Sequence, residues 1–397
     1  MEPKTEKHLS TDEKAISKKR LELPFHIVKR SNIALWKKIL IYAAALVGAL
    51  LLSAIICVAF SPKSGGSSKN IGDFFKFLFN GAFGTERKTW LFLLEMALLL
   101  GVSMALIPAF KMKFWNLGGN GQILMGCLCA YACSYWLGGK MPDWLLLIFM
   151  FVTAVAAGIL WALIPAIFKA VFNTNETLFT LMMNYIAVGI VLYFRAAWIK
   201  NGSGQYPTLK AGILPALDQY KALLTVIIFV VLTILMFVYL RYSKHGYEIS
   251  VVGESVNTAK YVGINVKAVI IRTMILSGAI AGLVGFFLIA RTGAGLSDNS
   301  PNNMGFTAIM TSWLASFNPL LMFLTCFFIA FINKGMIQVS TGFKFTNNSI
   351  ANIVVGLIYF FVIACAFFIN YKIVPRDKSG NKQDLEKKFA NQIKGVK

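Results

Sequence analysis

The sequence predicts an all-α protein, a polytopic bundle of transmembrane helices with about ten spans. Of its 397 residues, 57% are hydrophobic and 14% are charged, whereas soluble proteins carry about 25% charged residues. Several apolar runs reach the ~20 residues that a helix needs to cross a bilayer. The net charge of +22 comes from two basic tails and short loops, a distribution typical of juxtamembrane anchors. It therefore does not favour nucleic acid as a partner.

Hydropathy divides the chain into three regions. Residues 1–38 form a basic tail, residues 39–370 form the transmembrane domain with a polar loop at 241–266, and residues 371–397 form a second basic tail. Spans are expected at 39–60, 89–110, 114–138, 144–168, 177–197, 221–240, 267–290, 304–317, 319–337 and 349–370.

The distribution of lysine and arginine predicts the orientation, because cytoplasmic loops carry the excess of these residues. With the N-terminus inside and every run crossing, about two thirds of the 39 basic residues lie inside. If the short run 304–317 did not cross, the basic C-terminal tail would lie outside. We therefore expect a multi-pass protein of the cell membrane with both termini in the cytoplasm and the loop 241–266 on the same side.

Polar residues inside the predicted spans mark a candidate path across the membrane. The segment 116–122 holds three glycines and three amides, and backbone groups freed from a helix there survive only next to protein or a water-filled cavity. Other polar residues recur at helical spacing in the fifth and eighth spans. The alternative is close helix packing with interhelical hydrogen bonds. The candidate path residues are Asn116, Gly118, Asn120, Gln122, Thr180, Asn184, Tyr185, Thr307 and Thr311.

Two similar tripeptides suggest internal symmetry. Asn116-Leu117-Gly118 opens the third span and Asn303-Met304-Gly305 opens the eighth, which enter the membrane from opposite sides in the predicted topology. An inverted repeat of spans two to five onto seven to ten would make them equivalent. Inverted repeats with interrupted helices are a feature of transporters.

The candidate path is polar but neutral, and this suits a neutral hydroxylated solute such as a sugar or a nucleoside. Glu95 is the only carboxylate placed deep in a span. An acid inside the membrane is a functional candidate, but no partner for Glu95 is evident from the sequence. By contrast, Gly278, Gly282 and Gly285 form a small-residue stripe that indicates close helix packing.

The loop 241–266 is expected to hold a short helix outside the membrane. Gly253 and Gly263 bracket a segment long enough for two helical turns, Ser255 or Glu254 is suited to begin it, and Gly263 is suited to end it. A rigid helix at this place favours docking of a partner.

Signals for an enzyme are missing. The sequence has no Gly-x-x-x-x-Gly-Lys-Ser/Thr phosphate loop, and its three histidines lack the spacing of a metal site or a catalytic triad. We assign no catalytic residue, no metal site and no cofactor to this chain.

Several blocks of sequence resemble the permeases of nucleoside and simple-sugar ABC importers, the class that includes ribose and branched-chain amino acid permeases. Residues 116–126 resemble the Asn-Ile-Gly-Ala-Glu-Gly-Gln block of that family, and residues 175–186 resemble its Asn-Glu block that ends in Leu-Met-x-Asn-Tyr. Residues 252–264 resemble its cytoplasmic coupling segment, and residues 305–309 give a fainter match. One departure is Asn120, where the family commonly has glutamate.

The resemblance implies a membrane-spanning permease subunit that imports a solute by alternating access. It implies a cytoplasmic ABC ATPase that binds ATP on a separate chain, a second related permease, and an extracellular solute-binding protein or lipoprotein. The residues implied in coupling to the ATPase are Gly253, Glu254, Ala259, Tyr261, Gly263 and Ile264. The nucleoside branch is the leading interpretation because of the block at Asn184-Tyr185. A simple-sugar permease is the close alternative, and an ion-coupled secondary carrier that uses Glu95 is an alternative of a different class.

Overall fold

A computed structural model describes residues 25–29, 35–61, 70–199, 206–215, 223–291, 295–345 and 349–375. The chain divides into two compact units. The larger unit comprises residues 49–360, and the smaller one combines residues 1–48 with residues 361–397.

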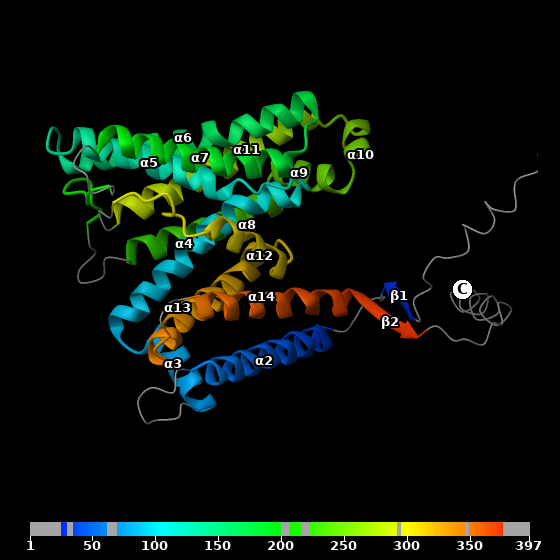
Figure 1. Cartoon of the computed structure of the whole chain (residues 1–397). Helices are drawn as coiled ribbons and strands as arrows, with labels where there is room; N and C mark the ends of the chain where they lie inside the picture. Colours follow the sequence, from blue (N-terminus) through cyan, green and yellow to red (C-terminus); the bar gives the residue numbers. More distant parts are fainter. Residues whose placement is uncertain are drawn as a thin grey trace, which may run out of the picture. The chain divides into compact units, whose positions relative to one another are not determined.

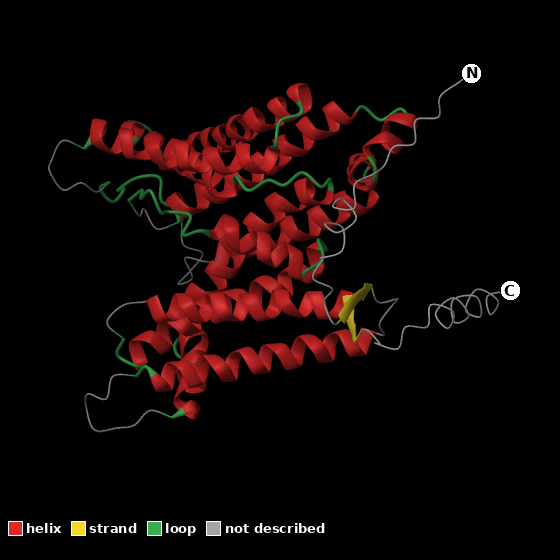
Figure 2. Cartoon of the chain, turned by 45° about the vertical axis from the view of Figure 1, so that its right-hand side comes forward, coloured by secondary structure: helices red, strands yellow, loops and turns green. Residues whose placement is uncertain are grey.

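Helices make up almost all of the described chain (Figures 1 and 2). They are α2 (Leu35–Ala59), α3 (Ile71–Phe83), α4 (Glu86–Lys111), α5 (Gly119–Leu137), α6 (Asp143–Phe172), α7 (Glu176–Trp198), α8 (Leu223–Tyr242), α9 (Lys244–Glu254), α10 (Val256–Tyr261), α11 (Val266–Ala290), α12 (Met304–Leu314), α13 (Pro319–Gly342) and α14 (Ser349–Asn370).

Each apolar run predicted from the sequence overlaps one of these helices. Among the described residues, six helices are long and apolar enough to cross a membrane, namely α4, α6, α7, α8, α11 and α13. Side-chain caps define several of their starts. Asn175 Oδ1 accepts a hydrogen bond from Leu178 N at 3.2 Å at the start of α7, and Asn265 Oδ1 accepts one from Ala268 N at 3.2 Å at the start of α11.

Helix α3 was not predicted from the sequence, because its 13 residues are too few to span a bilayer. It begins with a capping box, in which Asn70 N donates to Asp73 Oδ2 at 3.0 Å. Its buried face packs on α13, and a Cβ on Gly81 would lie 2.6 Å from the carbonyl oxygen of Lys334. Helix α3 is therefore part of the folded bundle.

Two strands form in the regions predicted to be basic tails. Strand β1 (Phe25–Lys29) pairs antiparallel with β2 (Tyr371–Pro375), and Ile27 lies opposite Ile373. They are the exception to the all-α class among the described residues. The rest of the two predicted tails, apart from the start of α2, lies outside the described residues.

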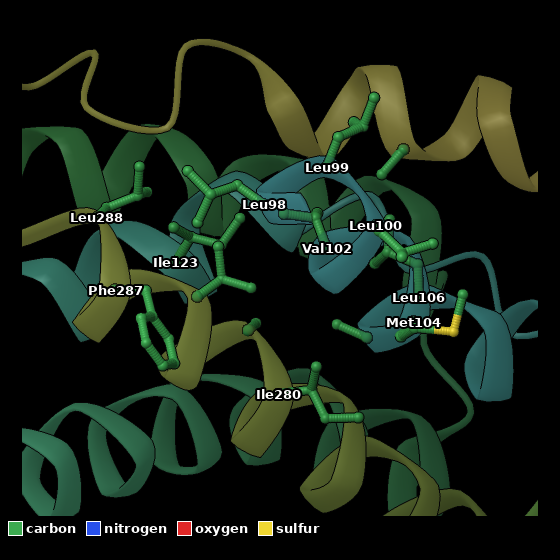
Figure 3. Close-up of a cluster of buried hydrophobic side chains, with 14 of the residues drawn as sticks. Leu98, Leu99, Leu100, Val102, Met104, Leu106, Ile123, Ile280, Phe287 and Leu288 are labelled. Carbon is green, nitrogen blue, oxygen red and sulfur yellow. The ribbon is translucent and has the colours of Figure 1, made fainter. Parts of the chain in front are cut away.

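Helices α4 and α11 form the centre of the larger unit. Between Met96 and Phe110 every residue of α4 is buried, and α11 is buried almost throughout from Ser277 to Ala290. Helix α4 contacts α8, α11, α12 and α13, while α11 contacts α4, α5 and α6. Figure 3 shows how leucines of α4 meet Ile123 of α5 and Ile280 and Phe287 of α11.

The glycine stripe of α11 packs against neighbouring backbone, as predicted. A Cβ on Gly278 would lie 2.4 Å from the carbonyl oxygen of Gly158, and one on Gly282 would lie 2.3 Å from that of Ala154. A Cβ on Gly285 would lie 2.5 Å from the carbonyl oxygen of Ile123. Helix α11 therefore packs against α6 and α5 at backbone contact, which no larger side chain permits.

Candidate functional site

The third predicted span is interrupted. Helix α4 ends at Lys111, and α5 begins only at Gly119. The non-helical segment between them lies beside α12, because the Trp115 ring packs on Trp313 at 5.6 Å near the C-terminal end of α12. At the other end of α12, Asn120 contacts Gly305. The segment therefore runs antiparallel to α12.

Helix α12, which covers most of the eighth predicted span, is also preceded by a non-helical segment. Residues 295–303 precede α12 and begin where Gly295 packs on the carbonyl oxygen of Tyr206. The Tyr206 ring lies 4.9 Å from that of Tyr131, which belongs to the C-terminal half of α5. The segment ends where α12 meets Asn120 at the start of α5. It therefore runs along α5, as the first segment runs along α12.

The starts of the two half-helices α5 and α12 meet. Gly305 N donates to Asn120 Oδ1 at 2.8 Å, and a Cβ on Gly305 would lie 2.7 Å from Asn120 N. The chain turns into α12 through Asn302 and Asn303, which have φ values of 44° and 55°. Asparagine tolerates this left-handed conformation better than most residues.

Buried amides hold the interruption before α5 in place. Asn116 Oδ1 accepts from Gly118 N at 3.0 Å and from Gln122 Nε2 at 3.4 Å. Its Nδ2 donates to Ser277 Oγ of α11 at 3.2 Å. Gln122 Oε1 is buried and has no hydrogen-bond partner among the described residues. These contacts satisfy backbone groups that the broken helix leaves free.

Two side chains of α7 bind the same interruption from the other side. Thr180 Oγ1 accepts from Leu117 N at 3.1 Å. Asn184 Oδ1 accepts from Gly121 N, and Asn184 Nδ2 donates to the carbonyl oxygen of Leu117, both at 2.8 Å. The amide of Asn184 therefore links α7 to Leu117 in the break and to Gly121 in the first turn of α5.

A cavity of ≈ 210 Å³ lies where the two half-helices begin. Its wall combines amides, two aromatic rings, aliphatic side chains and one carboxylate. The lining residues are Asn120, Leu124, Leu181, Asn184, Tyr185, Val188, Asp298, Asn299, Pro301, Asn303 and Phe306.

The structure places three of the candidate path residues, Asn120, Asn184 and Tyr185, in this wall. Tyr185 is 69% exposed. The remaining six lie outside it. Asn116, Gln122 and Thr180 are buried behind the wall, where they form hydrogen bonds, and Gly118 belongs to the same segment. Thr307 donates a hydrogen bond to the Asn303 carbonyl oxygen. Thr311 is buried against Ser103.

Sequence reasoning missed Asp298 and Asn299, which line the cavity from the segment before α12. In the predicted topology this segment was an external loop. The only available signal was the position of this segment before the Asn303-Met304-Gly305 tripeptide.

Helices α9 and α10, beside the C-terminal end of α4, form the loop that was predicted to dock a partner. Ser255 Oγ accepts from Thr258 N at 3.3 Å and begins α10. Gly263, with a φ of 82°, ends it. Gly263 N donates to the Lys260 carbonyl oxygen at 3.0 Å and Ile264 N to that of Ala259 at 2.9 Å, which is a Schellman motif. The predicted capping is therefore confirmed.

Helix α9 rests directly on the end of α4. A Cβ on Gly253 would lie 2.1 Å from the Lys111 carbonyl oxygen. Ala259 is fully buried, whereas Glu254 is exposed and Tyr261 is 91% exposed. Thus α10 presents a tyrosine outward while its other face is anchored to the bundle.

A second cavity of ≈ 250 Å³ adjoins these helices and is lined by residues including Lys113, Glu176 and Glu254. Glu176 Oε2 forms an ion pair with Lys169 Nζ at 2.8 Å. In α9, burial lowers the pKa of the His245 imidazole, and its Nδ1 is hydrogen-bonded to the Tyr239 hydroxyl.

Glu95, which had no evident partner in the sequence, has one in the structure. Its carboxylate Oε2 lies 2.5 Å from Lys334 Nζ, and the two side chains are 16% and 26% exposed. Glu95 belongs to α4 and Lys334 to α13, so the ion pair joins two helices. Neither residue lines the cavity at the half-helix starts.

Comparison with known proteins adds independent information. Residues 88–363 match the family model described as branched-chain amino acid transport system / permease component. A guanosine ABC transporter permease protein of Bacillus subtilis is 29% identical over 292 residues, which cover 71% of this chain and 78% of the relative. A glucose ABC transporter permease protein of Haloferax volcanii is 27% identical over 304 residues, with coverage of 71% and 78%. A nucleoside ABC transporter permease protein of Lactococcus lactis is 28% identical over 269 residues, with coverage of 63% and 70%.

Proposed function

Since the chain belongs to the branched-chain amino acid transport permease family and is a multi-pass ABC importer permease, we propose that it translocates a nucleoside by alternating access. The observation that carries this proposal is the cavity at the paired half-helix starts. Such sites near the middle of the membrane are where transporters bind their solutes.

The make-up of the cavity supports a nucleoside. Tyr185 and Phe306 offer aromatic surfaces for a flat base, being 69% and 38% exposed, and the surrounding amides suit the hydroxyls of a ribose. The relatives named for guanosine and for nucleosides agree with this solute. The relative named for glucose keeps a simple sugar as the second candidate.

The arrangement of helices supports the inverted repeat and the ten spans that we propose. Helix α4 packs on α12 and α13 in the way that α11 packs on α5 and α6. The non-helical segment before α5 runs antiparallel to α12, and the one before α12 runs antiparallel to α5. An axis in the membrane plane that relates α4 to α11 would also relate the two interruptions.

We propose that both termini and α9–α10 face the cytoplasm, because basic residues are concentrated there. The cavity would then be reached from the outside along α5 and α7. The partners of this topology are a cytoplasmic ABC ATPase that binds ATP, a second permease, and an extracellular solute-binding protein or lipoprotein. Hydrolysis of ATP is assigned to the partner and not to this chain.

Helix α10 is the proposed docking element for the ATPase. This helix packs on α9 and α11, and α9 in turn rests on the end of α4. This arrangement suits a part that passes motion into the bundle. The ion pair of Glu95 with Lys334 argues against the ion-coupled carrier, because it gives the intramembrane acid a role in joining helices.

The test is a pull-down from mild detergent with Tyr261→Ala, identifying bound chains by mass. Because Tyr261 is 91% exposed, the variant is expected to fold normally but to lose most of the co-purifying ATPase and of guanosine uptake. Tyr193→Ala is the matched control, since Tyr193 is 69% exposed near the C-terminal end of α7. An ATPase that is missing from the folded wild-type preparation contradicts the importer, and one retained by Tyr261→Ala contradicts the docking surface.

A further inference from the structure

Asp298 supplies the only charged side chain among the described residues that line the cavity. Its segment is fixed on both sides. Leu296 is 3% exposed, Pro301 is buried, and Gly295 packs on the backbone of Tyr206. The residues between these anchors are therefore held against the cavity, and Asp298 is exposed there.

One oxygen of this carboxylate is free to bind a solute. Asp298 Oδ1 accepts a hydrogen bond from Ser297 Oγ at 3.2 Å, whereas Oδ2 accepts none from the described residues. The oxygens of Asn120 and Asn184 are occupied by the backbone amides of Gly305 and Gly121. A solute that donates hydrogen bonds thus finds its strongest available acceptor at Asp298.

The helix starts around the cavity give this carboxylate a second effect. The N-termini of α5 and α12 both open here, at Asn120 and Asn303, and helix N-termini attract anions. Without a compensating negative charge, the cavity would favour phosphorylated solutes over uncharged ones. Asp298 is the carboxylate among the described lining residues that can oppose this preference.

We propose that Asp298 determines the specificity of the cavity by accepting hydrogen bonds from the vicinal hydroxyls of an uncharged ribose and by repelling anionic, phosphorylated forms. This inference rests on the proposed function, since it specifies the chemistry of the same solute site. A carboxylate is well suited to the task because it accepts from two hydroxyls and donates nothing.

The first experiment measures the charge preference of the cavity without any solute-binding protein. Asn299→Cys serves as the reporter variant in the purified full-length protein. It is modified with a cationic and, separately, with an anionic methanethiosulfonate reagent. The rate measured for the protein without this substitution is subtracted, because native cysteines also react. A charge about 6 Å away in water changes the local concentration of each reagent about threefold in opposite directions. The ratio of cationic to anionic rate should therefore fall about tenfold when Asp298→Asn is added.

The second experiment tests the hydroxyl contact by protection of the same cysteine. Guanosine should slow the modification, 2′,3′-dideoxyguanosine should protect several-fold less, and guanosine 5′-monophosphate should protect only the Asp298→Asn protein. Pro301→Ala, which keeps the charge, is the control for the segment.

An unchanged rate ratio, or equal protection by guanosine and its dideoxy analogue, overturns the assignment of Asp298. This failure is distinct from failure of the proposed function. A co-purifying ATPase together with an unchanged ratio removes only Asp298 from the site, whereas a missing ATPase removes the importer itself.

Discussion

Replacing Asn184 by leucine is expected to destabilise the protein as well as to impair transport. The substitution keeps the size of the side chain but removes an acceptor for Gly121 N and a donor for the Leu117 carbonyl oxygen. Both backbone groups lie at the interruption of α5, where no helical partner replaces the amide. Each group left unsatisfied costs about 1–2 kcal/mol, so the free energy of unfolding should fall by about 2–4 kcal/mol.

The assay is thermal unfolding of the purified protein in detergent at one fixed scan rate, because large membrane proteins unfold irreversibly. A decrease of roughly 2–5 °C in apparent Tm is expected for a chain of 397 residues. Tyr185→Leu is the neighbouring control, since Tyr185 is 69% exposed in the same cavity wall and its loss should change stability by less than ~0.5 kcal/mol. If Asn184→Leu melts with the wild type, Asn184 does not hold the interruption and the reasoning from these two hydrogen bonds is wrong.

Two further predictions concern helix packing. Gly282→Ala should lower the free energy of unfolding by about 1–3 kcal/mol, because its Cβ would lie 2.3 Å from the Ala154 carbonyl oxygen. Gly189→Ala is the control and should have little effect in the same thermal scan, because a Cβ there would have nothing within 4 Å. Equal melting temperatures of the two variants would refute backbone contact at Gly282. Glu95→Gln should lower the free energy of unfolding by about 1–2 kcal/mol, because it leaves Lys334 unpaired in a partly exposed site. Adding Lys334→Met should restore most of this lost stability. Solute accumulation should persist in that double variant, and its loss would instead support an ion-coupled carrier.

The positions of the long helices could be predicted from the sequence, because a transmembrane span requires a long run of apolar residues. The short helix α3 could not be predicted in this way. Its 13 amphipathic residues are fewer than the ~20 apolar residues by which a transmembrane span is recognised. The Schellman end of α10 could be predicted because glycine at 263 is a local signal. The pairing of β1 with β2 could not, because it joins segments from the two ends of the chain.

The candidate site was predictable only in part, for a related reason. The sequence marked Asn120 and Asn184 as polar residues in apolar surroundings, but not which of their atoms contact backbone and which face a cavity. That division depends on the break before α5, which places the amides between helices. Asp298 gave no signal beyond its place in the segment before the tripeptide at 303–305, because only the fold brings this polar segment beside α5.

The ion pair between Glu95 and Lys334 has a consequence for the order of biosynthesis. Glu95 of α4 is synthesised about 240 residues before Lys334 of α13. At 5–20 residues per second, Glu95 is therefore without this partner for roughly 10–50 s. A lone charge at the centre of a helix costs about 2.5–3.5 kcal/mol on insertion scales, which the many leucines of α4 offset. During that interval α4 should remain beside the insertion machinery rather than diffuse into lipid, and the bundle should close around it only when α13 arrives.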